Sequence, residues 1–200
     1  MANMLFDKYS YDVEITDPSL KNYIFLNKLT YPNSYRRTSN KDFSKAKINI
    51  IERLENALMR GGTGGKISGH VIRTKGKLQG KKLKVMHIIE VAFDQINKKT
   101  NQNPLQIFIR ALENSAPIED TTRVRYGGIF SNIAVDISAS RRLDYALRNI
   151  SIAAILSSFD KKNTITDALA TELILAANND PNGYAIKRKN DIERMARSAR

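Results

Sequence analysis

Apolar side chains that recur every three to four residues constrain this chain more than any other feature of its sequence. Six segments carry this spacing, as Leu54 and Leu58 do in the first segment and Leu169 and Leu173 in the fifth. Such spacing places the apolar residues on one face of an α-helix, and that face must be covered by another element. The sequence therefore predicts a mainly α fold, a helical bundle of about six helices.

Local signals near the ends of these segments give approximate helix boundaries. The predicted helices span residues 48–58, 85–97, 104–112, 140–159, 166–177 and 185–199. Asn103 and Pro104 are a strong start for the third helix, because asparagine caps free N–H groups and proline fits the first helical position. Thr166 is expected to cap the fifth helix, and the run of Asn, Asp, Pro and Gly at 178–183 ends it.

One segment departs from the helical spacing. Residues 121–126 and 129–137 flank Gly127 and Gly128, a glycine pair suited to the tight turn of a hairpin. In the second arm, Ile133, Val135 and Ile137 alternate with polar residues, as expected for a strand. The pattern predicts a two-stranded β-ribbon that protrudes from the helical body. Such a ribbon is marginally stable alone, so its tip is expected to be free to reach a partner.

The 200 residues divide into an extension and one domain. Residues 1–47 are predicted to form a partly basic, extended N-terminal segment. Residues 48–200 are predicted to fold as a single helical domain that carries a basic Gly-rich loop at 60–84 and the ribbon at 121–137. A chain of this length buries enough apolar surface to fold without disulfides or a bound metal.

The positive charge is concentrated in one central stretch. The chain has a net charge of +13, and residues 36–110 alone contribute +12, from seventeen basic and five acidic groups. A field of this size favours polyanionic partners, nucleic acid first and an anionic membrane surface second. The composition therefore predicts a nucleic-acid-binding protein.

The loop at 60–84 combines this charge with backbone freedom. It holds eight basic residues, no acid, and seven of the ten glycines. Glycine lets the backbone approach a phosphate closely, so the loop can order against RNA. The alternative is a plain flexible linker, which needs no such charge. On charge, the loop supplies candidate RNA contacts at Lys66, Arg73, Lys75, Lys77 and Lys84.

The residues that most enzymes require are missing. The chain has no cysteine and two histidines, so it cannot build a zinc site of the usual types. Gly65 and Lys66 resemble part of a phosphate-binding loop, but the glycine expected five places before the Gly65 position is Arg60, and Ile67 stands where the magnesium-binding hydroxyl is needed. No apolar run is long enough to cross a membrane. We expect no catalytic residues, no metal and no cofactor.

Several strings in the sequence resemble the universal small-subunit ribosomal protein S-seven family, in its archaeal and eukaryotic branch. They are Ile51–Leu54, Gly80–Lys82, Asn103–Gln106, Ala111–Pro117, Glu119–Arg123, Ala134–Ser138, Arg141–Arg142, and Tyr184–Lys189 with Glu193–Ala196. Together they cover roughly residues 41–200, and in combination they are highly specific.

The resemblance implies a helical bundle with a protruding β-ribbon, and a function in translation. It implies a structural component of the small ribosomal subunit that binds the 3′ major domain of small-subunit rRNA and nucleates assembly of the head. It also implies contact with exit-site tRNA and mRNA, neighbouring small-subunit ribosomal proteins as partners, and a place in the cytoplasmic ribosome.

The resemblance also assigns individual residues. For rRNA binding it implies Lys81, Lys82, Arg141 and Arg142, and, by character more than by exact string, Arg36, Arg37, Lys41 and Lys45. For tRNA and mRNA it implies the ribbon and the carboxy-terminal region, that is Arg123, Arg125, Tyr126, Gly127, Gly128, Lys187 and Lys189.

The sequence departs from the family pattern at two positions. Ala139 stands where the family often has proline, and Ile118 where an arginine often follows proline, which removes one candidate phosphate contact. Two other classes compete with the ribosomal interpretation. A free-standing helix-turn-helix regulator needs a base-reading helix and usually a dimer surface, and an RNA-modifying enzyme needs a cofactor loop or metal ligands.

Overall fold

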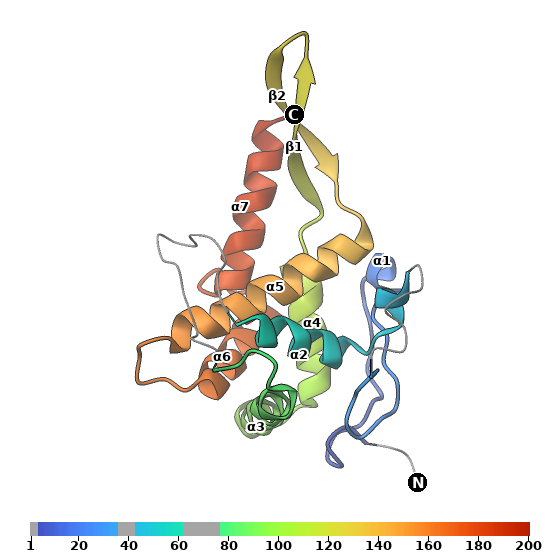
Figure 1. Cartoon of the computed structure of the whole chain (residues 1–200), viewed down its shortest axis with the longest axis vertical. Helices are drawn as coiled ribbons and strands as arrows, with labels where there is room; N and C mark the ends of the chain where they lie inside the picture. Colours follow the sequence, from blue (N-terminus) through green and yellow to red (C-terminus); the bar gives the residue numbers. More distant parts are fainter. Residues whose placement is uncertain (1–3, 36–42, 62–76) are drawn as a thin grey trace.

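The structure is a computed structural model that describes residues 4–35, 43–61 and 77–200. Its regular elements are, in chain order, α1 (Pro18–Lys21), the 3-10 helix η1 (Ser44–Lys47), α2 (Ile50–Arg60), α3 (Lys82–Thr100), α4 (Pro104–Ser115), β1 (Glu119–Tyr126), β2 (Ile129–Asp136), α5 (Ala139–Ser158), α6 (Ile165–Ala177) and α7 (Tyr184–Ser198). Helices α2 to α6 form a body from which the β1–β2 ribbon projects, with α7 beside its base (Figure 1).

The six helices predicted from apolar spacing are present as α2 to α7, which confirms the mainly α fold. Asn103 caps α4 as predicted, because its Oδ1 accepts the N–H of Leu105 at 3.1 Å. The cap predicted at Thr166 is wrong. Thr164 takes that position, and its Oγ1 accepts the N–H of Asp167 at 3.2 Å, so the cap lies two residues earlier than expected.

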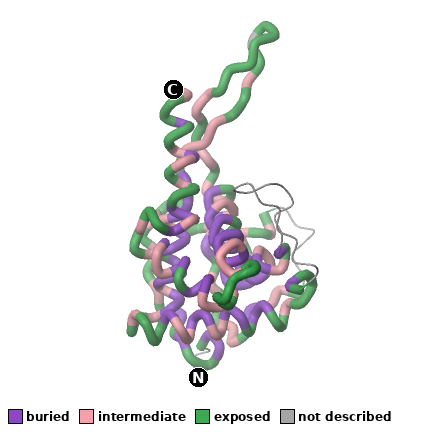
Figure 2. The backbone as a smooth tube through the Cα atoms, turned by 90° about the vertical axis from the view of Figure 1, so that its left-hand side faces the viewer, coloured by how far each residue is buried: buried purple, intermediate pink, exposed green. Residues whose placement is uncertain are grey.

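The hydrophobic core lies where α3, α4, α5 and α6 meet, and it forms the continuous buried centre of the body in Figure 2. Phe93 of α3 and Phe108 of α4 are both fully buried, and their ring centroids lie 6.1 Å apart. Ile150 of α5 and Leu169 of α6 are also fully buried. This packing gives the surface features described below a rigid support.

Residues 4–35, which we call the N-terminal strap, share this core. Leu5, Phe6 and Leu20 are at most 2% exposed, and the Phe6 ring lies 6.3 Å from that of Phe93. The strap has little regular structure, as expected for an extended segment. The boundary expected at residue 47 nevertheless does not divide the core, because the strap and the helices bury their apolar side chains together.

Side chains of α4 hold the strap through its backbone. The amide of Gln106 donates to the carbonyl of Glu14 at 2.9 Å and accepts the N–H of the same residue at 2.8 Å. One carboxylate oxygen of Glu113 accepts the N–H groups of Thr16 and Asp17, at 2.6 and 2.8 Å. The helix therefore supplies partners for backbone groups that would otherwise need another strand or water.

The ribbon is an antiparallel pair of eight-residue strands with the predicted turn. Residues Glu119 to Tyr126 pair with Asp136 to Ile129 in order. Gly127 and Gly128 have φ of 53° and 93°, the left-handed values that this tight turn requires. The base is tied to α7 because Glu193 accepts the N–H of Ile118 at 3.2 Å and Arg200 pairs with Glu119. The outer part extends beyond the end of α7 (Figures 1 and 2).

Candidate nucleic-acid interface

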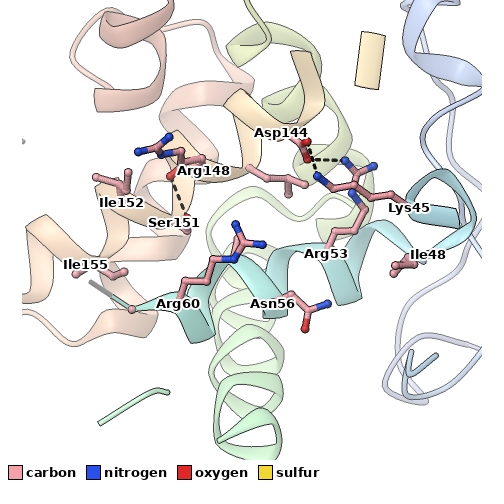
Figure 3. Close-up of a pocket in the computed structure, with 13 residues that line it drawn as sticks. Lys45, Ile48, Arg53, Asn56, Arg60, Asp144, Arg148, Ser151, Ile152 and Ile155 are labelled. Carbon is pink, nitrogen blue, oxygen red and sulfur yellow. Dashed lines mark hydrogen bonds and ion pairs between the residues drawn. The ribbon is translucent and has the colours of Figure 1, made fainter. Parts of the chain in front are cut away.

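A groove between α2 and α5 gathers four cationic side chains. Its volume is about 630 Å³, and its basic residues are Lys45 from η1, Arg53 and Arg60 from α2, and Arg148 from α5 (Figure 3). Asp144 of α5 is the one acid among the described residues that line it, so the lining carries a net charge of +3, four positive minus one negative.

Helical spacing explains how these residues share one groove. On α2, Arg53, Ala57 and Arg60 are separated by four and three residues, so they point to the same side. On α5, Asp144, Arg148 and Ser151 repeat this arrangement. Apolar residues complete the lining: Ile48, Leu147, Ile152 and Ile155. The groove between the two helices is therefore lined by both charged and apolar side chains.

Asp144 organises one end of the groove. Its Oδ1 accepts from Nη2 of Arg53 at 3.0 Å, and its Oδ2 pairs with Nζ of Lys45. The Arg53 side chain is only 5% exposed, and its Nη1 donates to the carbonyl of Tyr23 at 3.4 Å. Its Nε has no partner among the described residues. Arg53 is thus a fixed cation in the wall of the groove, shared between α5 and the strap.

The other end of the groove holds two uncompensated cations. Arg60 and Arg148 are exposed and both line the groove, and Figure 3 shows the Arg60 guanidinium in the space between α2 and α5. Within residues 4–35, 43–61 and 77–200, neither guanidinium has a carboxylate within ion-pair distance. The carbonyl of Arg148 accepts the Ser151 hydroxyl at 2.9 Å, an ordinary contact within the helix.

This arrangement is suited to a chain of phosphates. Guanidinium groups bind phosphate oxygens with two parallel hydrogen bonds, and they are more weakly hydrated than ammonium groups. Several cations along a groove neutralise successive phosphates and release condensed counterions. An isolated small anion needs fewer contacts, so the groove fits a polyanion better than a single phosphate.

Arg142 was expected to contact phosphate, and the structure gives it a different role. Its side chain is buried: Nε donates to the Pro117 carbonyl at 3.2 Å, Nη2 pairs with Asp17 at 2.9 Å, and Nη1 donates to the Ser19 hydroxyl. Burial alone would raise the pKa of Asp17, but hydrogen bonds from Ser19 and the charge of Arg142 outweigh it and hold that pKa below its usual range. Arg142 fastens the strap to α5, while its neighbour Arg141 is exposed.

Lys82 is likewise directed into the protein. Its Nζ donates to Glu52 at 2.7 Å and to Oδ1 of Asn33 at 2.9 Å, and lies 3.9 Å from Glu55. Glu55 is fully buried, and neither of its carboxylate oxygens has a hydrogen-bond partner among the described residues. Burial raises the pKa of Glu55 to about 8, with Lys82 opposing the shift and Glu52 adding to it. Lys82 therefore joins the strap, α2 and α3.

The other expected rRNA contacts fall into two groups. Lys77, Lys81 and Lys84 are exposed at or just before the start of α3. The rest lie outside the described residues, namely Arg36, Arg37, Lys41, Lys66, Arg73 and Lys75. Of the seven expected rRNA contacts that lie within the described residues, the structure brings one, Lys45, into the groove.

The residues expected to face tRNA and mRNA lie on two neighbouring elements. Arg123 and Arg125 are exposed on β1, and Gly127 and Gly128 form the turn beyond them. Tyr126 is the last residue of β1. On α7, Lys187 is exposed and Lys189 is half-buried. The ribbon and α7 thus form one projection, separate from the α2–α5 groove.

Arg53, Arg60 and Arg148 are the groove residues that sequence reasoning missed. Arg53 stands between apolar residues of α2 and reads as an ordinary surface charge. The available signal was the helical phase, because Arg53 and Arg60 are seven residues apart on the same side of α2. This phase identifies groove residues only when α5 is known to pack beside α2. The spacing within each helix does not predict which helices are neighbours.

No group of three or more His, Asp or Glu that could hold a metal ion occurs within the described part of the chain. None of the helices described is both long and apolar enough to cross a membrane.

Comparisons with known proteins agree with the resemblance seen in the sequence. The model of the family described as Ribosomal protein S7p/S5e matches residues 22–200. The chain is 42% identical over 198 residues to "Small ribosomal subunit protein uS7" of Cenarchaeum symbiosum (strain A). The aligned region covers 98% of this chain and 96% of that protein. The match extends into the strap, beyond residues 41–200, where the sequence motifs lie. The chain therefore belongs to the ribosomal protein S7p/S5e family.

Proposed function

We propose that this protein binds small-subunit rRNA through the α2–α5 groove. Membership of the family makes it a structural ribosomal protein of the small subunit and not an enzyme, which sets aside both the RNA-modifying and the free-standing regulator alternatives. The observation that carries the proposal is the cationic groove, in which Arg60 and Arg148 have no carboxylate partner among the described residues.

The groove supplies positioning contacts, and the shape of the RNA supplies selectivity. Arg53 and Lys45 are already fixed by Asp144, so little freedom is lost when a phosphate binds beside them. Arg60 and Arg148 then take the next phosphates along the groove. Proteins recognise folded RNA mostly through its shape and backbone, which a rigid two-helix groove can match.

The finer assignment follows the family resemblance. The RNA is the 3′ major domain of small-subunit rRNA, and binding nucleates assembly of the head of the subunit in the cytoplasmic ribosome. The ribbon and α7, which project away from the groove, face exit-site tRNA and mRNA. Neighbouring small-subunit proteins are the remaining partners. The separation of the groove from the ribbon supports such a division of labour.

The test compares binding to the folded 3′ major domain with binding to an unrelated folded RNA of equal length, at several salt concentrations. The double variant Arg60→Gln, Arg148→Gln removes the two uncompensated cations. Lys98→Gln, Lys99→Gln is the matched control, because it removes the same charge from the exposed end of α3.

Wild-type protein is expected to prefer the 3′ major domain at both low and high salt. The groove variant is expected to lose about 10- to 100-fold in affinity and to reduce the slope of log K against log salt by about two, one for each lost phosphate contact. Equal losses in the groove variant and the control would place the binding surface elsewhere. Equal binding of both RNAs would leave only a generic basic protein.

A further inference from the structure

The outer part of the ribbon carries an aromatic ring between two arginines. The register pairs Arg125 directly with Phe130, and Arg123 lies two residues earlier on the same face of β1. The guanidinium carbon of Arg123 lies 4.2 Å above the centroid of the Phe130 ring, and that of Arg125 lies 5.7 Å from it. Three planar groups therefore cluster on one face of the ribbon.

This cluster is open to solvent. Phe130 is 55% exposed, and both arginines are exposed as well. Residues 121–135 contain no acid, and in the described part of the chain neither arginine has a carboxylate within ion-pair distance. Arg200, just after the end of α7, pairs with Glu119 at the base of β1, and the cluster lies further along the ribbon toward the turn. An exposed phenylalanine held by arginines, rather than by a core, has a planar surface available to a partner.

We infer that the Arg123–Phe130–Arg125 cluster is a stacking platform for an unpaired nucleobase of single-stranded RNA. The inference rests on the proposed function, because it names what the ribbon recognises in the RNA. Bases that are not paired in a helix stack on aromatic rings and on guanidinium planes, and every base has a π-face to offer. The two positive charges hold the adjoining backbone.

Three features favour a single strand over a duplex. Stacking requires a free base face, and in a duplex those faces are covered by neighbouring base pairs. The two arginines offer far fewer phosphate contacts than the rows of cations that duplex binders use. The glycine turn adds no side chains beyond the platform, so a splayed base can reach it from the tip.

Two conservative substitutions separate stacking from charge and from apolar area. Phe130→Leu keeps an apolar side chain but removes the π-face. Arg123→Lys keeps the positive charge but removes the planar guanidinium. Ile129→Ala is the control, because Ile129 is 77% exposed next to Phe130 and alternation of the strand places it on the opposite face. All three sites are exposed, and an unchanged helical circular dichroism spectrum checks the fold.

The full-length protein is titrated by fluorescence anisotropy with three labelled probes: a short oligouridylate, the same oligomer without its bases, and an RNA duplex of equal charge. We expect wild type to prefer the intact single strand, and Phe130→Leu and Arg123→Lys to weaken that binding about tenfold. Ile129→Ala is expected to bind as wild type does. Equal binding of the oligomer with and without bases, or unchanged binding by Phe130→Leu, would overturn the inference.

The folded 3′ major domain serves as a fourth probe, which keeps the two proposals apart. If the groove is the rRNA site, the double variant Arg60→Gln, Arg148→Gln binds the folded 3′ major domain more weakly. It still prefers the intact single strand to the same oligomer without its bases. If that double variant binds the domain normally, the proposed function of the groove fails, whatever the ribbon variants show. If the groove variant behaves as expected and Phe130→Leu does not, the stacking platform alone fails.

Discussion

We expect Glu55 to make the stability of this protein depend on pH, and Glu55→Gln to remove its share of that dependence. The carboxyl group is fully buried without a hydrogen-bond partner among the described residues, and burial raises its pKa from 4.5 to about 8. Since the folded state holds this proton more tightly than the unfolded state, the contribution of Glu55 to stability is fully present below pH 4.5. It is lost as the pH rises from about 4.5 to about 8.

The magnitude follows from the two pKa values. Each pKa unit corresponds to about 1.36 kcal/mol, so the loss between 4.5 and 8 amounts to about 5 kcal/mol at most, and to about 3 kcal/mol by pH 7. Glutamine has nearly the same shape and no titratable group. Its amide leaves a buried donor, which costs about 1–3 kcal/mol, but this cost does not change with pH.

The assay is urea denaturation followed by circular dichroism, at several pH values between about 5 and 8. The free energy of unfolding of Glu55→Gln minus that of wild type is expected to rise by about 3 kcal/mol between about pH 5 and about pH 8. This rise is expected whether the variant is more or less stable than wild type at about pH 5. Glu14→Gln, the same change at an exposed site on the strap, controls for charge. A constant difference between Glu55→Gln and wild type would refute the reasoning, because it would show that Glu55 does not titrate in the folded protein within this range.

Three further substitutions test the contacts around the groove and the strap. Arg142→Lys keeps the charge but loses the forked donors that reach Asp17. We therefore expect thermal or urea denaturation to show a free energy of unfolding lower by about 2–4 kcal/mol. A decrease below about 0.5 kcal/mol would place Arg142 at the surface in solution. Asp144→Asn removes the one acid among the described groove residues, so titration with an unrelated RNA should show tighter binding and a steeper salt dependence; weaker binding would mean that Asp144 acts mainly by positioning. Glu113→Ala removes the acceptor for two backbone N–H groups, at Thr16 and Asp17, so limited proteolysis should cut the strap faster than in wild type, and an unchanged rate would show that apolar packing alone holds it.

The sequence was sufficient to predict which segments are helical and where the ribbon turns. Apolar spacing is a property of each segment by itself, so α2 to α7 could be recognised without knowing their neighbours. The glycine pair at 127 and 128 determines its turn in the same local way. The misplaced cap at Thr166 shows the limit of such signals, because Thr164, two residues earlier, has the same side chain.

The direction of individual cations could not be predicted. Arg141 and Arg142 are adjacent and chemically identical, yet one is exposed and the other is buried against the strap. The difference arises from the rotation of about 100° between consecutive helical residues, and from what covers each side of α5. Lys82 follows the same rule, since its partners come from α2 and from residue 33. Net charge indicates that a chain binds polyanions, but packing decides which cations remain free to do so.

The fastening of the strap also has a consequence in time. Asp17 and its partner Arg142 are 125 residues apart in the chain. At a synthesis rate of about 5–20 residues per second, roughly 6–25 seconds separate the appearance of the two residues. During this interval the strap can pack against α3 and α4, as Phe6 does against Phe93, but it lacks its ion pair with α5. The amino-terminal end, although synthesised first, completes its native contacts only after α5 has been made.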